Sequence, residues 1–187
     1  MNYIETNIPG VWIIEPVVFN DARGYFFEAF KQSGFEQHIG RVGFIQENES
    51  SSSRGVLRGL HYQLNPFSQA KLVRVIQGCV WDVAVDLRKG SATFGQHVAI
   101  ELSSENKRQL FIPRGFAHGF HVLSEQAVFT YKVDNPYHPA SERSIRYDEP
   151  TFGVDWRIPD GESPILSEKD KQAPPLAKGD FNFIYNP

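Results

Sequence analysis

The chain has 187 residues, of which 41% are hydrophobic and 13% aromatic, which is the size and apolar content of one globular domain with a single core. Its formal net charge is −3 and its basic residues are scattered, so no basic face indicates a nucleic acid or an anionic membrane as a partner. The sequence shows no apolar run of membrane-spanning length, no signal peptide and no cysteine pair, and we therefore expect a cytoplasmic protein.

Short segments that alternate apolar and polar residues, or are rich in Val, Ile, Phe and Tyr, predict a mostly β structure. In chain order, the predicted strands are residues 11–19, 43–48, 56–64, 72–77, 80–87, 97–102, 109–112, 119–123 and 127–134. One helix is predicted near residues 31–38, and Gln77-Gly78 suits a tight hairpin turn. The lone cysteine, Cys79, begins a predicted strand, and we expect an unreactive thiol there.

From Asn135 onward the composition shifts toward Pro, Asp and Glu, and repeated prolines between Pro136 and Pro175 oppose regular strand pairing. We expect this C-terminal segment to wrap around the barrel of a single domain that spans residues 1–187, with a short helix near residues 167–172. Many short strands with regular turns predict a sandwich, a jelly roll or a barrel.

His61 lies on a polar face of the predicted strand 56–64. Side chains alternate along a strand, so His61 and Gln63 point to one face while Leu60 and Tyr62 point to the other. An isolated strand histidine is most often solvated or satisfied in a core. Here a lysine, a tyrosine and further histidines recur on nearby strands, and this concentration favours a small-molecule pocket centred on His61.

The spacing of His61, Gln63 and Lys71 between two glycines resembles the first motif of the cupin superfamily. Residues 113–118 (PRGFAH) resemble the Pro-x-Gly-x-x-His core of its second motif. Metal-binding cupins carry His-x-His followed by Glu in the first motif, whereas here Gln63 replaces the second histidine and Lys71 stands at the glutamate position. Because an ammonium group repels a divalent cation, we expect no metal.

Lys71 supplies a positive charge suited to an oxygen that becomes negative during a reaction. Together with a base (His61) and a possible acid (Tyr131), it forms the minimum set for removing and returning a proton α to a carbonyl. If the base and the acid lie on opposite faces of the carbon, its configuration inverts. The predicted reaction is therefore an epimerisation.

Five segments resemble the dTDP-4-dehydrorhamnose 3,5-epimerase family over nearly the whole chain, and their order and spacing make the resemblance specific. They are residues 21–30, 54–63, 71–88, 112–120 and 163–170. The resemblance implies an all-β cupin jelly roll, or double-stranded β-helix, with short peripheral helices, which forms a homodimer without metal or other cofactor. It also implies epimerisation of dTDP-4-keto-6-deoxy-D-glucose at C3 and C5 to dTDP-4-keto-L-rhamnose, in dTDP-L-rhamnose biosynthesis.

The resemblance also implies residue roles. His61 falls on the general base, Asp170 on the carboxylate that pairs with it, Lys71 on the lysine that faces the C4 oxygen, and Tyr131 on the acid that reprotonates from the far side. Tyr137 matches an aromatic residue that stacks on the thymine ring. The other positions that the family uses for ligand contact are Arg23, Glu28, Gln46, Asn48, Arg58, His118, Glu142 and Lys169.

Among these, Arg23 and Arg58 suit a diphosphate, since a guanidinium fork pairs with phosphate oxygens. The family's diphosphate site commonly draws residues from both subunits, which is the basis for expecting a homodimer. The chain departs from the family pattern at Glu47, Glu49 and Ser51, where relatives often have Asp, His and Arg. These departures leave the supporting hydrogen bonds of that segment open.

Three alternatives remain from the sequence. A single-centre epimerase, acting at C3 or C5 in another deoxysugar route, would use the same base and cation. A non-catalytic sugar-nucleotide-binding cupin would need the arginines and Tyr137 but has no use for His61, Lys71, Tyr131 and Asp170 together. A metal-dependent cupin oxygenase is opposed by Gln63 and Lys71.

Overall fold

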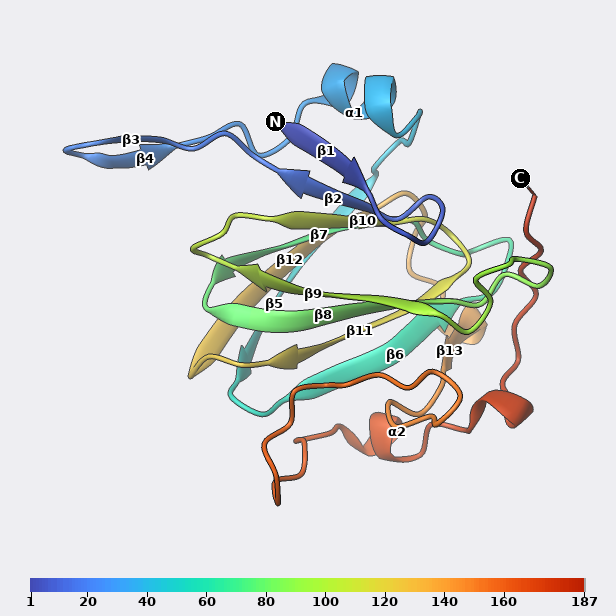
Figure 1. The fold of residues 1–187 in the computed structure, drawn as a ribbon. Coiled ribbons are helices and arrows are strands. Elements are labelled where there is room, and N and C mark those ends of the chain that lie inside the picture. Colours follow the sequence, from blue (N-terminus) through green and yellow to red (C-terminus); the bar gives the residue numbers. More distant parts are fainter. Residues whose placement is uncertain (187) are drawn as a thin grey trace.

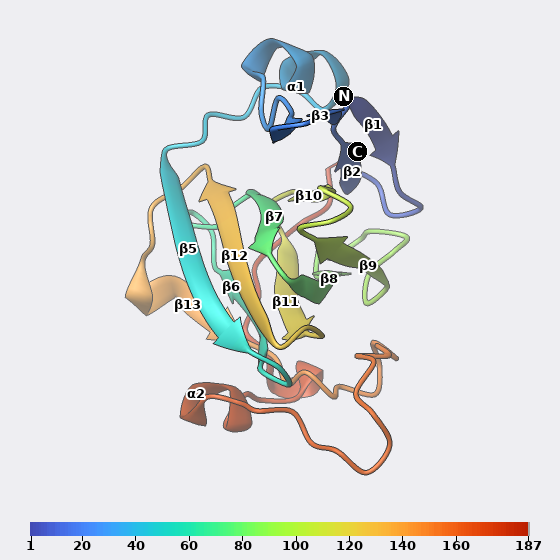
Figure 2. The same ribbon diagram turned by 90° about the vertical axis from the view of Figure 1, so that its left-hand side faces the viewer.

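Two antiparallel sheets face each other in the computed structural model, which describes residues 1–186 (Figures 1 and 2). One sheet has the strand order β1 (Asn2–Glu5), β2 (Trp12–Glu15), β10 (Gln109–Ile112), β7 (Lys71–Gln77), β12 (Gln126–Val133) and β5 (Gln46–Ser53). The other has the order β13 (Glu142–Ser144), β6 (Leu57–Gln63), β11 (Phe116–Val122), β8 (Cys79–Asp86) and β9 (His97–Ser103). The predicted jelly roll is confirmed, because strands distant in the sequence are neighbours in both sheets.

The core forms because apolar side chains alternate along the strands. In β8, Val80 and Ala84 point between the sheets, whereas Val83 and Val85 point to the outer face of their sheet. All four are fully buried, and burying one valine side chain stabilises a fold by roughly 1.5–3 kcal/mol. Both faces of this interior strand therefore contribute to stability.

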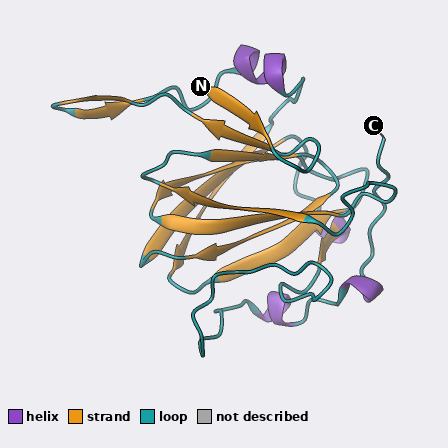
Figure 3. Ribbon diagram, viewed as in Figure 1, coloured by secondary structure: helices purple, strands orange, loops and turns teal. Residues whose placement is uncertain are grey.

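Different parts of the chain cover the two outer faces. Helix α1 (Gln32–His38) packs Phe35 against Phe111 of the six-stranded sheet. The C-terminal segment packs Phe152, Trp156 and Phe183 against the five-stranded sheet. That segment also carries helix α2 (Glu168–Lys171) and the two 3₁₀ helices, η1 (Pro139–Ser141) and η2 (Leu176–Lys178), and Figure 3 shows how few helices accompany the strands.

Both predicted helices are present, and neither exceeds two turns. Within residues 1–186, no helix has the length and apolar character needed to cross a membrane. Cys79 begins β8 as expected, and burial raises the pKa of its thiol to about 11. This thiol is therefore protonated at neutral pH, in agreement with an unreactive strand cysteine.

The predicted strand 11–19 is wrong in its extent. Strand β2 ends at Glu15, before Pro16, and the chain then forms a separate hairpin of β3 (Phe19–Asp21) and β4 (Gly24–Phe26) that projects from the body (Figure 1). Phe19 and Phe26 on this hairpin are 62% and 70% exposed. Proline interrupts strand pairing because it has no N–H to donate, and this explains the break.

Strand β5 runs further than the prediction of residues 43–48. It continues through the serines to Ser53 because β12 pairs with it along its whole length, from Gln46↔Val133 to Ser53↔Gln126. Backbone hydrogen bonds to the neighbouring strand therefore compensate for the low β propensity of serine. The short strands β1 and β13 were not predicted, and β13 has three polar residues without any apolar alternation.

A bulge in β6 shapes the site described below. Across the β6–β11 pair, His61 lies opposite His118 and Arg58 lies opposite Phe120, so β6 has one more residue than β11 between these pairs. A β-bulge of this kind changes which side chains share a face. Arg58 and His61, three residues apart, consequently both line one cavity between the sheets.

The bulge depends on the close approach of two backbones at Gly119. A methyl group added there would lie 2.6 Å from the carbonyl oxygen of Arg58 and 3.3 Å from the Trp156 ring. We expect Gly119→Ala to lower the free energy of unfolding by roughly 1–3 kcal/mol, because the strands must separate. Urea denaturation measures this change.

Gly43→Ala is the matched control, because a methyl group at Gly43 meets no atom within 4 Å. We expect this variant to stay within about 0.5 kcal/mol of the parent, or to gain slightly from reduced freedom of the unfolded chain. Equal stability of the two variants would contradict the close packing of β6 on β11.

Candidate active site

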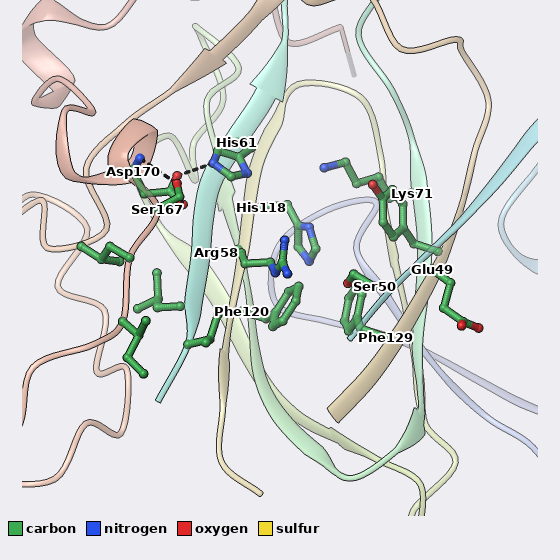
Figure 4. A pocket seen from close by; sticks show the side chains of 16 residues that line it. Glu49, Ser50, Arg58, His61, Lys71, His118, Phe120, Phe129, Ser167 and Asp170 are labelled. Atoms are coloured by element: carbon green, nitrogen blue, oxygen red, sulfur yellow. Dashed lines mark hydrogen bonds and ion pairs between the residues drawn. The ribbon is translucent and has the colours of Figure 1, made fainter. Parts of the chain in front are cut away.

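A cavity of about 470 Å³ lies between the two sheets (Figure 4). Strands β6 and β11 line it from the five-stranded sheet, strands β5, β7 and β12 line it from the six-stranded sheet, and the segment leading into α2 closes one side. Its volume is in the range of small-molecule sites. All four predicted catalytic residues, His61, Lys71, Tyr131 and Asp170, line this one cavity.

His61 is held by the carboxylate of Asp170. Nε2 of His61 lies 2.5 Å from Oδ1 of Asp170, and Figure 4 shows the imidazole between this carboxylate and the cavity. The Asp170 side chain is 3% exposed and the His61 side chain 29%. A carboxylate that accepts the Nε2 proton favours the tautomer with a lone pair on Nδ1. Nδ1 is therefore the nitrogen available as a base.

Ser167 fixes Asp170 at the start of helix α2. Its hydroxyl donates to Oδ2 of Asp170 at 2.8 Å, and the backbone N–H of Asp170 donates to the same hydroxyl at 3.1 Å. Ser167 is thus the N-cap of this helix, a position that serine favours. Ser167 was not among the predicted site residues, although a serine three residues before an acid indicates such a cap.

The Asp170 carboxyl is charged at neutral pH. Burial raises its pKa, but the hydrogen bond and charge of His61, the Ser167 hydroxyl and nearby Lys169 together hold that pKa below its ordinary value. A charged carboxylate stabilises the imidazolium that forms when His61 takes up a proton. The pair is therefore suited to general base chemistry.

Lys71 and Tyr131 enter the cavity from the opposite sheet to His61. Lys71 begins β7, Tyr131 lies on the neighbouring strand β12, and the Lys71 ammonium is 5.9 Å from the centre of the Tyr131 ring. Figure 4 shows Lys71 across the cavity from His61. The sandwich therefore presents a base on one wall and a cation with a phenol on the other.

Burial shifts the pKa of both Lys71 and Tyr131. It lowers the pKa of Lys71 to about 8, although the negative charges of Asp82 and Glu142 act in the opposite direction. Burial also raises the pKa of the Tyr131 phenol above its ordinary value, against the effects of Asn48 and Arg58. At neutral pH, Lys71 is therefore cationic and Tyr131 retains its proton.

A second histidine–carboxylate pair is formed by His118 on β11 and Asp82 on β8. Nε2 of His118 is 2.9 Å from Oδ2 of Asp82, whose side chain is fully buried on β8. Burial lowers the pKa of His118, even though Asp82 opposes this shift. The sequence analysis missed Asp82. The available signal was an acid between Val80 and Ala84, two residues that face the interior.

Polar residues predicted to contact a ligand lie along the edge strand β5 and the bulge of β6. Gln46 donates to Asn48 at 2.8 Å, and both lie on the same face of β5 as Ser50, which lines the cavity. Nε of Arg58 donates to the hydroxyl of Ser52 at 3.0 Å. This bond orients a guanidinium that lines the cavity, and the group has further N–H donors for an anion.

Three other predicted ligand residues form a separate network. The hydroxyl of Tyr137 donates to Oε2 of Glu142 at 2.8 Å, and the ammonium of Lys169 lies 2.6 Å from the same oxygen. Burial raises the pKa of Glu142, but the hydrogen bonds of Lys169 and Tyr137 act in the opposite direction, and the pKa lies below its ordinary value. Tyr137 is 54% exposed, so its side chain is accessible to a ligand.

The structure does not bring Arg23 or Glu28 to the cavity of its own chain. Arg23 is at the turn of the projecting β3–β4 hairpin, paired with Asp21, and its side chain is 90% exposed. Glu28 is exposed in the segment after the hairpin. Of the departures from the family pattern, Glu47 pairs with Lys132 at 2.7 Å. That departure has therefore acquired its own supporting contact.

In residues 1–186, no three His, Cys, Asp or Glu side chains are grouped so that they could hold a metal ion. At the positions of the cupin metal motif, Lys71 brings a positive charge to the cavity and Gln63 bonds to loop backbone instead of lining it. The donor set of the cavity therefore suits an organic anion better than a divalent cation.

Comparisons with known proteins identify the family of this chain. A sequence model described as dTDP-4-dehydrorhamnose 3,5-epimerase matches residues 5–178. The chain is 52% identical over 182 residues to the dTDP-4-dehydrorhamnose 3,5-epimerase of Shigella flexneri, which covers 97% of this chain and 99% of that protein.

Solved structures show the same likeness. The dTDP-4-dehydrorhamnose 3,5-epimerase from Elizabethkingia anophelis NUHP1 has a TM-score of 0.90 and 52% identity, covering 95% of this chain and 97% of its own. The dTDP-6-deoxy-D-glucose-3,5-epimerase from Legionella pneumophila Philadelphia 1, in complex with dTDP-4-keto-L-rhamnose, has a TM-score of 0.90 and 51% identity, covering 95% and 93%. The resemblance indicated by the sequence motifs is confirmed, and the chain belongs to the dTDP-4-dehydrorhamnose 3,5-epimerase family.

Proposed function

We propose that this chain epimerises dTDP-4-keto-6-deoxy-D-glucose at C3 and C5 to dTDP-4-keto-L-rhamnose, in dTDP-L-rhamnose biosynthesis. The observation that carries the proposal is the placement of His61 on one sheet and of Lys71 and Tyr131 on the other, across a single cavity. A sugar carbon held between the sheets would have a base on one face and an acid on the other. The relatives named above support the choice of substrate.

In the first step, Nδ1 of His61 removes the proton on C5, next to the C4 carbonyl. Asp170 accepts the hydrogen bond from Nε2 throughout and stabilises the imidazolium. The electrons of the C–H bond move into the carbonyl and form an enolate. The Lys71 ammonium stabilises the negative oxygen that results.

In the second step, the Tyr131 phenol returns a proton to the same carbon from the opposite face, and the configuration inverts. The raised pKa of Tyr131 keeps this proton in place until the enolate forms. The imidazolium then loses its proton to solvent and the phenolate takes one from solvent, which restores both groups. The same cycle at C3 completes the reaction.

The remaining predicted residues are proposed to bind the substrate. Arg58 binds the diphosphate and Tyr137 stacks on the thymine ring. The sugar and the phosphates are held by Gln46, Asn48, His118, Glu142 and Lys169. Asp82 is a positioning residue, since its hydrogen bond fixes the His118 ring.

We also propose a homodimer in which Arg23 and Glu28 of one chain serve the cavity of the other. The projecting β3–β4 hairpin, with its exposed Phe19 and Phe26, supports this assembly, because large apolar side chains are costly to leave in water. We further propose that residues 1–187 act as one cytoplasmic domain without metal or other cofactor.

The direct test of the activity is the stereochemistry of the product by NMR. We expect the parent protein to convert dTDP-4-keto-6-deoxy-D-glucose to a product inverted at both C3 and C5. We expect His61→Ala to lower kcat/KM by about 10²–10⁴-fold, because a general base contributes that much. Binding of dTDP to this variant should stay within about threefold, since His61 contacts the sugar and not the nucleotide.

His97→Asn serves as the control, because His97 on β9 does not line the cavity and bonds to the Phe152 carbonyl. It should leave turnover near normal. A product inverted at one carbon alone would overturn the two-centre activity, and near-normal turnover by His61→Ala would overturn the base assignment.

The pH dependence of the reaction tests the cation. Lys71 is protonated below its pKa of about 8 and neutral above it, so its attraction for the enolate is lost as the pH rises. We expect kcat/KM to fall above about pH 8. Because arginine stays charged to pH 12 and beyond, Lys71→Arg should move this alkaline limb to higher pH, even if its maximum rate is lower.

Lys132→Arg is the matched control on the outer side of β12, where Lys132 pairs with Glu47. It should keep the alkaline limb of the parent protein. Tyr131 does not account for a limb at pH 8, because its pKa lies above the ordinary tyrosine value of about 10. A limb that remains near pH 8 in Lys71→Arg would exclude Lys71 as its origin.

A further inference from the structure

Gln63 is a buried residue that the proposed mechanism does not use. It ends β6, two residues after His61, and is 5% exposed. Its side-chain nitrogen donates to the carbonyl oxygens of Phe67 at 2.7 Å and of Pro136 at 3.1 Å, and its side-chain oxygen accepts from the backbone N–H of His138 at 2.7 Å. One amide group therefore satisfies two carbonyls and one N–H.

The two bonds to residues 136 and 138 lie on either side of Tyr137. This arrangement fixes the backbone that carries the Tyr137 ring. Among residues 1–186, the one hydrogen bond of the Tyr137 side chain is that of its hydroxyl to Glu142. Glu142 in turn lies opposite Gln63 in the β13–β6 pair. Tyr137 is thus held at its flanking backbone by Gln63 and at its hydroxyl by Glu142. Gln63 lies on β6, the strand that carries His61, and Glu142 lies on β13, which pairs with β6.

Two more side-chain amides join the same two loops. Gln69 donates to the carbonyl of Asn135 at 2.7 Å, and Asn135 donates to the carbonyls of Pro66 and Ser68 at 2.9 and 3.1 Å. We call Gln63, Gln69 and Asn135 the amide clamp. It ties residues 66–69 to residues 135–138 through bonds to backbone atoms.

We propose that Gln63 is a positioning residue for nucleotide binding, which it assists by holding Tyr137 in the direction needed to stack on the base. This inference rests on the proposed stacking role of Tyr137. Ordering a loop before the ligand arrives reduces the entropy that binding would otherwise cost. The position that carries a metal ligand in other cupins thus supports the nucleotide site here.

The chemistry of the position explains why an amide occupies it. A glutamate of the same shape has no N–H for the Phe67 and Pro136 carbonyls, and it would bring negative charge close to both oxygens. A methionine keeps the length but makes none of the three bonds. Gln63→Glu and Gln63→Met therefore remove the clamp in two different ways.

A double-mutant cycle tests the inference, with the affinity for dTDP measured by calorimetry. We expect Gln63→Glu and Gln63→Met each to weaken dTDP binding about fivefold or more, with kcat for the keto sugar within about threefold of the parent. In the Tyr137→Ala background, either change should alter the dTDP affinity less than twofold, because Gln63 acts on binding through the Tyr137 ring, which this background lacks. Use of both variants keeps the test valid if one fails to fold.

Asn106→Asp is the matched control. Asn106 is also an amide that bridges backbone groups, with its nitrogen on the Glu101 carbonyl at 3.0 Å, but it lies in the β9–β10 connection. Asn106→Asp should leave the affinity for dTDP unchanged. It thereby distinguishes the loss of support at Tyr137 from a general loss of rigidity in the protein. Equal weakening by the Gln63 variants with and without Tyr137, or loss of kcat with unchanged dTDP binding, would overturn the inference.

The stacking role itself is tested by Tyr137→Ala alone. If this variant binds dTDP as tightly as the parent, then the stacking role is wrong and the role of Gln63 is wrong with it. Absence of keto-sugar epimerisation by the parent, together with the expected cycle for dTDP, would refute the proposed activity and leave the role of Gln63 intact.

Discussion

The distance between two facing sheets governs the chemistry of this cavity. His61 is attached to one sheet, and Lys71 and Tyr131 are attached to the other, so the imidazole and the phenol approach a ligand between the sheets from opposite directions. Closely packed cores resist changes in that separation. The fold therefore supplies the two directions of attack that the proposed inversion needs.

The cavity and the residues that support it also gather charges that would be costly in an ordinary core. Asp82 and Asp170 are almost fully buried, and each is paired with a histidine, which offsets much of the cost of burial. Lys71 differs, because burial lowers its pKa and the nearby acids restore only part of it. Its charged form therefore destabilises the fold at neutral pH, and this cost is consistent with a group reserved for a negative intermediate.

Much of the fold and of the site could be predicted from sequence, and the exceptions have physical reasons. Alternation identified the strands that carry His61 and Tyr131, whereas only the family resemblance pointed to Asp170. Asp82 was missed because one acid in an apolar strand has no local partner, and its histidine lies 36 residues away. The projecting hairpin with Arg23 was missed because no periodicity marks it. The clamp around Tyr137 depends on loops that meet only after the sheets have formed.

In the proposed reaction, proton removal and proton return occur on opposite faces of the same carbon. The most direct measurement is NMR of the reaction in D₂O, with the parent protein and with Tyr131→Phe. We expect solvent deuterium at both C3 and C5 in the parent, and exchange that exceeds inversion in the variant, because His61 can still remove and return a proton on its own face. Retention of either original hydrogen by the parent, or exchange at neither carbon by Tyr131→Phe, would refute removal and return on opposite faces.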